Sequence, residues 1–148
     1  MDRAEGYPEV CGKGKLFTMA PPIERRYVDY QNTYGSFAFI DIGRYQSAQA
    51  AADALKAARS IVGACRDWVY EANGNQVGAR VAPLDAKALG PDAVAVAIGL
   101  SSRGLGVANQ YVVARAGADL VRVISGWSVG QAVPALPIAR SVQQRLGA

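Results

Sequence analysis

Short runs in which hydrophobic and polar residues alternate recur along the chain, and each run predicts a β-strand. Residues 24–30 and 36–42 form two such runs around a turn and predict a first hairpin. Asn73-Gly74 separates two later runs and predicts a second hairpin, because both positions of a type I′ turn need positive φ. The last three runs predict a meander. The predicted strands are residues 24–30, 36–42, 67–70, 76–81, 93–100, 109–116 and 120–125.

One segment instead has apolar residues at spacings of three and four, which is typical of an amphipathic helix. It runs from residue 48 to residue 64 and is rich in alanine, and Ser47 before it is a suitable N-cap. Residues 83–91 form a later connection between strands, with room for a single helical turn. We therefore predict one long helix in the first half of the chain.

The end of the chain, within residues 131–146, predicts a second helix. Ile138, Val142 and Leu146 recur at a spacing of four and would pack inward. Pro137 would lie in the first turn, where its missing N–H donor is tolerated. The polar residues of this segment are expected to face water, and they are Arg140, Gln143, Gln144 and Arg145.

The predicted order is two strands, a helix, five strands and a helix. Strands joined mainly by tight turns favour an antiparallel sheet, and amphipathic helices need an apolar sheet face to cover. We therefore predict an α+β fold with a largely antiparallel sheet of about six or seven strands and two main helices packed on it. Residues 1–22 are rich in turn-forming residues and predict an irregular N-terminal arm, and residues 23–148 predict a single α+β domain.

The composition fits one globular domain, since 51% of the 148 residues are hydrophobic and 19% are charged. The net charge of +4 comes from basic residues that are scattered along the chain, so we expect no nucleic-acid partner. No apolar run is long enough for a membrane-spanning helix, and no apolar stretch follows Met1. Any export signal or membrane tether is therefore expected outside this chain.

The chain contains no histidine. This excludes Ser-His-Asp and Cys-His nucleophile systems and removes the commonest metal ligand, so we expect neither a metal nor another cofactor. Paired carboxylates remain an alternative route to catalysis, and the acids on or beside predicted strands are Asp29, Asp41, Asp67 and Glu71. Asp41 alternates with Ile40 and Ile42 and is expected on the wetter face of the sheet. We therefore expect a binding domain that is not an enzyme.

Tyrosine rings on the predicted strands are suited to line a ligand cleft, because each combines an apolar body with one polar atom. Strand arginines could add a cationic wall for an anionic ligand. The alternative interpretation is that the aromatic rings pack the core and the arginines are solvated. The candidate ligand-binding residues are Arg25, Tyr27, Tyr30, Tyr70, Arg80 and Tyr111.

Cys11 and Cys65 are the only cysteines. One interpretation is two buried, reduced thiols. The other is a disulfide that closes a loop of about 54 residues. Cys11 lies in a polar, glycine-containing segment that is not an obvious core position, and an exposed unpaired thiol would be a liability, so the disulfide is favoured.

A larger pattern resembles a known family. Its centre is the stretch from Tyr45-Gln46-Ser47-Ala48 through the alanine-rich helix to Ala64-Cys65. An aromatic strand precedes this stretch, and a meander and a last helix around Ile138-Ala139-Arg140 follow it. Over roughly residues 9–147 it resembles the PknH-like extracellular sensor domain of actinobacterial Ser/Thr protein kinases and of related secreted or lipid-anchored proteins. The excess of Arg over Lys in an Ala- and Gly-rich chain also indicates a GC-rich, actinobacterial source.

The resemblance implies an antiparallel sheet with packed helices, a ligand cleft and a place outside the cytoplasm. The family usually has two disulfides, whereas this chain can form at most one. Of its two cysteines, Cys65 matches the family pattern better than Cys11 does. We therefore expect an extracellular or cell-envelope sensing domain for an unidentified small molecule or envelope component. The alternatives are a small natural-product enzyme or isomerase that uses a buried strand carboxylate, which could be cytoplasmic, and a protein assembly module that could form a homo-oligomer.

Overall fold

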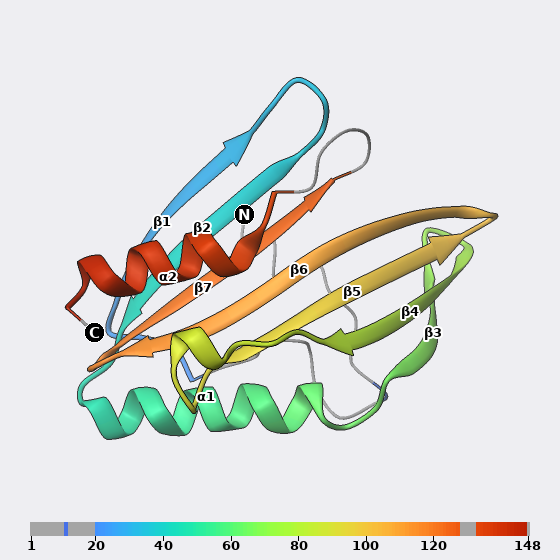
Figure 1. The fold of residues 1–148 in the computed structure, drawn as a ribbon. Coiled ribbons are helices and arrows are strands. Elements are labelled where there is room, and N and C mark those ends of the chain that lie inside the picture. The colour runs from blue at the N-terminus through green and yellow to red at the C-terminus, as the bar shows by residue number, and fades with distance from the viewer. Residues whose placement is uncertain (1–10, 12–19, 128–132, 148) are drawn as a thin grey trace.

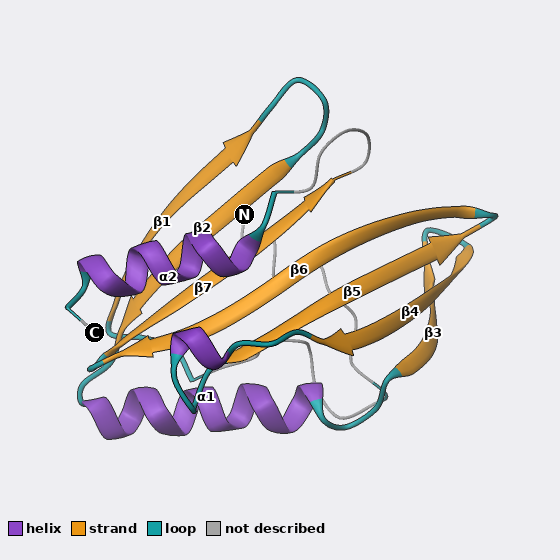
Figure 2. Ribbon diagram, viewed as in Figure 1, coloured by secondary structure: helices purple, strands orange, loops and turns teal. Residues whose placement is uncertain are grey.

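A computed structural model describes residue 11 and residues 20–127 and 133–147. Its centre is a seven-stranded antiparallel sheet with the strand order β1-β2-β7-β6-β5-β4-β3 (Figures 1 and 2). The strands are β1 (Glu24–Gln31), β2 (Phe37–Arg44), β3 (Asp67–Ala72), β4 (Asn75–Pro83), β5 (Val94–Ser102), β6 (Leu105–Ala116) and β7 (Asp119–Trp127). The helices are α1 (Ala48–Val62), α2 (Ala135–Arg145) and the single 3₁₀ turn η2 (Lys87–Leu89). The predicted α+β fold is confirmed.

Local turn chemistry explains why the strand predictions succeed. Asn73 and Gly74 have φ values of 51° and 75°, so the predicted two-residue hairpin turn between β3 and β4 is confirmed. Arg103 and Gly104, with φ values of 51° and 78°, make the same kind of turn between β5 and β6. Because these turns are tight, β3 pairs with β4 and β5 pairs with β6 as antiparallel hairpins.

The two main helices lie on opposite faces of the sheet, which gives three layers. Alternate residues of β6 and β7 point to opposite sides, so Tyr111 and Val113 pack toward α1 while Val112 and Ala114 pack toward α2. The face of α1 toward the sheet consists largely of alanine, which allows close approach, and its buried residues are Ala51, Ala54, Leu55 and Ala58. Ser47 is the predicted N-cap, since its Oγ accepts a hydrogen bond from the Ala50 N–H at 3.1 Å.

The C-terminal helix is rotated relative to its prediction. Pro137 lies in the first turn as predicted, but Gln143 is buried and is not in water. Its Nε2 donates to the carbonyl oxygens of Leu89 and Arg115, both at 2.8 Å, and these two bonds compensate for the burial of the amide. Ile138 and Val142 are only partly buried beside this contact. The prediction that Gln143 faces water is therefore wrong.

Cys11 and Cys65 form a disulfide, with their Cα atoms 6.3 Å apart. The favoured interpretation of the two cysteines is confirmed, and the alternative of two reduced thiols is wrong. The bond ties the N-terminal arm to the turn after α1. Most of the predicted arm, residues 1–10 and 12–19, lies outside the described residues, so its irregular form stays a prediction. None of the described helices combines the length and the apolar character needed to span a membrane.

Candidate functional site

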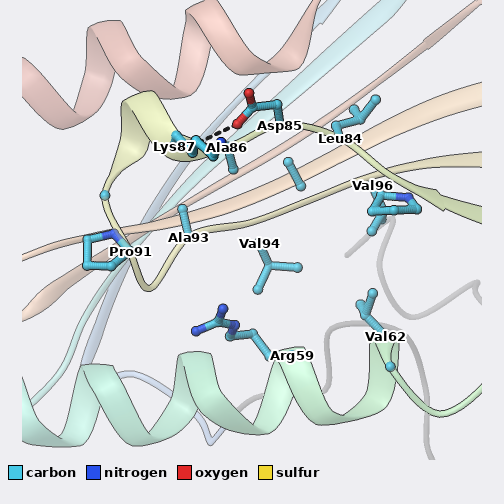
Figure 3. Close-up of a pocket in the computed structure, with 14 residues that line it drawn as sticks. Arg59, Val62, Leu84, Asp85, Ala86, Lys87, Pro91, Ala93, Val94 and Val96 are labelled. Atoms are coloured by element: carbon cyan, nitrogen blue, oxygen red, sulfur yellow. Dashed lines mark hydrogen bonds between the residues drawn. The ribbon is translucent and has the colours of Figure 1, made fainter.

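A cleft of about 650 Å³ opens between the C-terminal half of α1 and the connection from β4 to β5 (Figure 3). Its floor is apolar and is formed mainly by Val94 and Val96 of β5, with Leu84 and Val62 at the sides. The size falls within the range of about 300–1,000 Å³ that small-molecule sites have.

Two local features hold the connection away from β5 and so leave the cleft open. The connection leaves β5 after Leu84, whose N–H donates to the Ala95 carbonyl at 2.8 Å just beyond the end of β4 at Pro83. The Asp85 carboxylate accepts a hydrogen bond from the Lys87 backbone N–H at 3.0 Å and starts the η2 turn (Figure 3). Gly90 then reverses the chain with a φ of 101°, a conformation that favours glycine.

Two cations line this apolar cleft. Figure 3 shows the Arg59 side chain extending from α1 into the space below Val94. Lys87 contributes the second cation from η2. Within the described part of the chain, neither the Arg59 guanidinium nor the Lys87 ammonium has a hydrogen-bond or ion-pair partner, and the one lining carboxylate, Asp85, bonds to a backbone N–H. The cleft therefore combines apolar surface with uncompensated positive charge.

The structure does not bring the six predicted ligand-binding residues together. Arg25, Tyr27 and Tyr30 lie on β1 at one edge of the sheet. Tyr70 and Arg80 lie on β3 and β4 at the opposite edge, where burial raises the pKa of the Tyr70 hydroxyl. Tyr111 is fully buried in the core between them.

The sequence prediction missed the two cleft cations because nothing local distinguishes them. Arg59 is an exposed helix residue in the sequence pattern, and Lys87 lies in a connection. Only the approach of α1 to the segment before β5 gives them a common surface. A usable signal was the unusual length of that connection, which contains Pro83, Gly90 and Pro91.

A second hollow, of about 810 Å³, lies over strands β3 to β6. Its lining includes the small residues Gly78, Gly99 and Ala108, which leave space above the sheet. Its charged groups form an ion pair, with Arg80 Nε at 2.7 Å from Asp67 Oδ1, and this hydrogen bond raises the pKa of the Arg80 guanidinium. The hollow is therefore large enough for a ligand, but its charged groups neutralise each other.

Asp41 is one of two buried carboxylates among the described residues, with 5% of its surface exposed, and Asp119 at 7% is the other. Its Oδ1 accepts from Arg25 Nε at 2.7 Å, and its Oδ2 accepts from Arg122 Nη2 at 2.6 Å. The prediction that Asp41 lies on the wetter face is wrong, because two guanidinium groups compensate for its burial. Since cations occupy both oxygens, this carboxylate is not placed to take a proton from a ligand.

The Tyr45 hydroxyl lies near this cluster and donates to the Ala20 carbonyl at 2.8 Å. Burial raises the pKa of Tyr45, and the nearby Asp41 charge adds to this while Arg122 opposes it. The other three predicted acids, Asp29, Asp67 and Glu71, are exposed. The described residues contain no group of three or more potential metal ligands.

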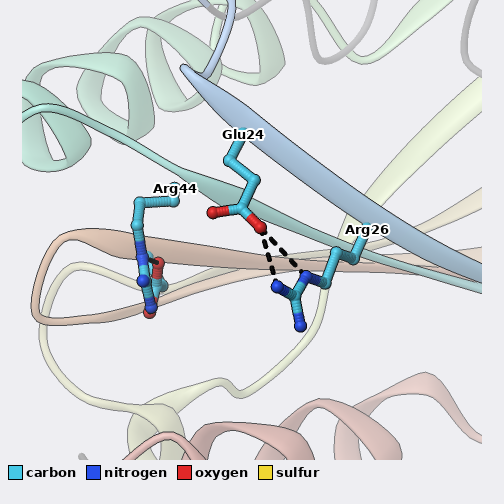
Figure 4. Close-up of polar contacts among 4 residues, drawn as sticks. Glu24, Arg26 and Arg44 are labelled. Atoms are coloured by element: carbon cyan, nitrogen blue, oxygen red, sulfur yellow. Dashed lines mark hydrogen bonds and ion pairs between the residues drawn. The ribbon is translucent and has the colours of Figure 1, made fainter.

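A third, smaller hollow of about 200 Å³ near the end of α2 is lined by charged residues that pair with one another (Figure 4). Glu24 Oε1 lies 2.8 Å from Arg26 Nη2. Arg44 binds Asp119 through two hydrogen bonds, at 2.9 and 3.1 Å, and these bonds raise the pKa of its guanidinium. Because acids and bases are matched, this hollow offers no free charge to a ligand.

No family model matches the chain, and no curated protein matches its sequence. Among solved structures, the chain is similar to the extracellular domain of PknH from Mycobacterium tuberculosis, with a TM-score of 0.64 and 10% sequence identity. The match covers 82% of this chain and 63% of that chain, so this chain spans less than two thirds of that domain. The similarity supports the resemblance seen in the sequence at the level of the fold alone.

Proposed function

We propose that this chain is an extracytoplasmic ligand-binding domain of the PknH-like sensor type and that its cleft between α1 and β5 binds an amphipathic organic anion. The observation that carries the proposal is the pair of cations, Arg59 and Lys87, without partners above an apolar floor. An anion with an apolar body would cover Val94 and Val96 and place its carboxylate, sulfonate or phosphate group at the guanidinium. Arginine suits this role because it can bind such groups through two parallel hydrogen bonds.

Two further observations support a place outside the cytoplasm and a role in sensing. Disulfides such as Cys11–Cys65 persist in oxidising compartments and are rare in the cytosol. The fold is similar to an extracellular domain. The absence of histidine and the occupied Asp41 carboxylate favour recognition over catalysis.

Ligand binding can be tested with anilinonaphthalene sulfonate, an aromatic anion whose fluorescence rises on binding. We expect the folded protein to bind it, and we expect Arg59→Glu to raise the Kd at least about tenfold, which corresponds to about 1.4 kcal/mol. Lys56→Glu is the matched control, because it makes the same charge change on an exposed residue of α1 that does not line the cleft. Its Kd should stay within about twofold of the wild-type value.

A competition experiment separates recognition of the negative charge from nonspecific hydrophobic binding. Dodecanoate should displace the fluorescent anion, whereas dodecylammonium, with the same alkyl chain and the opposite charge, should not. Equal displacement by both, or an Arg59→Glu variant that binds like wild type, would contradict the proposed site.

A further inference from the structure

β1 is an open edge of the sheet and carries an unusual concentration of exposed apolar side chains. In the part of the chain that the structure describes, β1 has a neighbouring strand on one side only, and all eight of its residues are exposed. Five of the eight exposed large hydrophobic residues lie in or beside it, with exposures between 57% and 71%; they are Ile23, Tyr27, Val28, Tyr30 and Tyr34. Proteins normally protect such an edge, so this one indicates an interaction surface.

The backbone of β1 is suited to pairing with another strand. Asn32 N–H donates to the Ser36 carbonyl at 3.0 Å, and this bond shows which residue pairs of the β1–β2 ladder are hydrogen-bonded and which are not. Even-numbered residues therefore bond toward β2, and the N–H and C=O groups of Arg25, Tyr27 and Asp29 point toward the open edge. The main helices pack on the central strands, so they leave this edge accessible.

Two of the four charged residues of β1, Arg25 and Asp29, are self-complementary, and Arg25 also binds Asp41 of its own chain through Nε at 2.7 Å. A two-fold axis through Tyr27, perpendicular to the sheet, would place Tyr27 opposite Tyr27 of a second copy and Arg25 opposite Asp29, twice. This register keeps each pair on one face of the joined sheet, and it uses the residues whose backbone groups point outward. Opposite charges and aromatic pairs across antiparallel strands are stabilising, whereas like charges are not.

We propose that β1 pairs antiparallel with β1 of a second copy of this chain, so that two seven-stranded sheets join into one. The contact is isologous, because each surface is its own complement, and it closes as a dimer without leaving that edge open. The proposal goes beyond the ligand site, since β1 contributes no residue to the cleft.

Sedimentation velocity over a range of concentrations tests the dimer. We expect wild type to be dimeric and Asp29→Arg to raise the dimer dissociation constant at least about tenfold, because it places arginine opposite Arg25 at both ends of the contact. Glu71→Arg is the matched control, since it makes the same charge change on β3 at the opposite edge. This variant should dimerise like wild type, and circular dichroism should show that both variants are folded.

Cysteine crosslinking tests the register. Tyr27→Cys should form an intermolecular disulfide under mild oxidation, while Val28→Cys should not, because only residue 27 meets its own copy across the axis. A wild-type protein that is monomeric at millimolar concentration would overturn the proposal. It would also be overturned by an Asp29→Arg variant that stays dimeric, by loss of the dimer in Glu71→Arg, or by crosslinking through residue 28 in place of 27. Arg59→Glu should leave the dimer unchanged, so failure of the dimer and failure of the ligand site are distinguishable.

Discussion

Asp41 is held by partners from two neighbouring strands and depends on both. Arg122 lies directly opposite it in the β2–β7 register and has only 6% of its side chain exposed. A buried ion pair is costly to form, but removal of one partner is worse, because the other charge is then left buried without compensation.

We therefore expect Asp41→Asn to lower the free energy of unfolding by about 3–5 kcal/mol. The neutral amide can still accept one hydrogen bond, but it no longer balances the Arg122 charge. Glu71→Gln, the same kind of change on an exposed strand residue, should stay within about 0.5 kcal/mol of wild type. Urea denaturation of the three proteins measures this, and a loss below about 1 kcal/mol in Asp41→Asn would show that the cluster is well hydrated.

At the scale of elements, the sequence predicts what neighbours along the chain determine. Both helices and all seven strands are found close to their predicted ranges, since Asn73-Gly74, Ser47 and Pro137 act within a few residues. What the sequence could not predict depends on distant contacts. Asp41 meets a residue 81 positions away, and Gln143 bonds to a carbonyl 54 positions away. The candidate cleft also depends on distant contacts, because Arg59 and Lys87 share a surface only after α1 packs on the sheet.

The contact of α2 with η2 gives a prediction for an element. Gln143→Ala should lower the free energy of unfolding by about 1–3 kcal/mol, because the buried carbonyls of Leu89 and Arg115 lose their donor. Gln144→Ala is a close control, since it is the next residue of the same helical turn and is exposed. Thermal unfolding should therefore separate the two variants, and equal midpoints would contradict the bonding of the Gln143 amide.

At the scale of the whole molecule, the disulfide restricts a loop of 54 residues that contains β1, β2 and α1. In the chain-entropy model, such a crosslink stabilises the folded state by about 4 kcal/mol, within a measured range of about 0–5 kcal/mol. We expect the double variant Cys11→Ser/Cys65→Ser to lose about this amount in guanidinium denaturation. Wild type treated with reductant should match the variant, and a reduced protein as stable as the oxidised one would contradict this role.

Of all neighbouring strand pairs in the sheet, only β2 and β7 are not consecutive along the chain. The strand that joins the first hairpin to the meander is therefore the last of these seven strands to be synthesised. Until residues 119–127 are available, the β1–β2 hairpin and strands β3 to β6 cannot join into one sheet. The long-range pairing of β2 with β7 is therefore expected to form late in folding, after the local hairpins on either side of it.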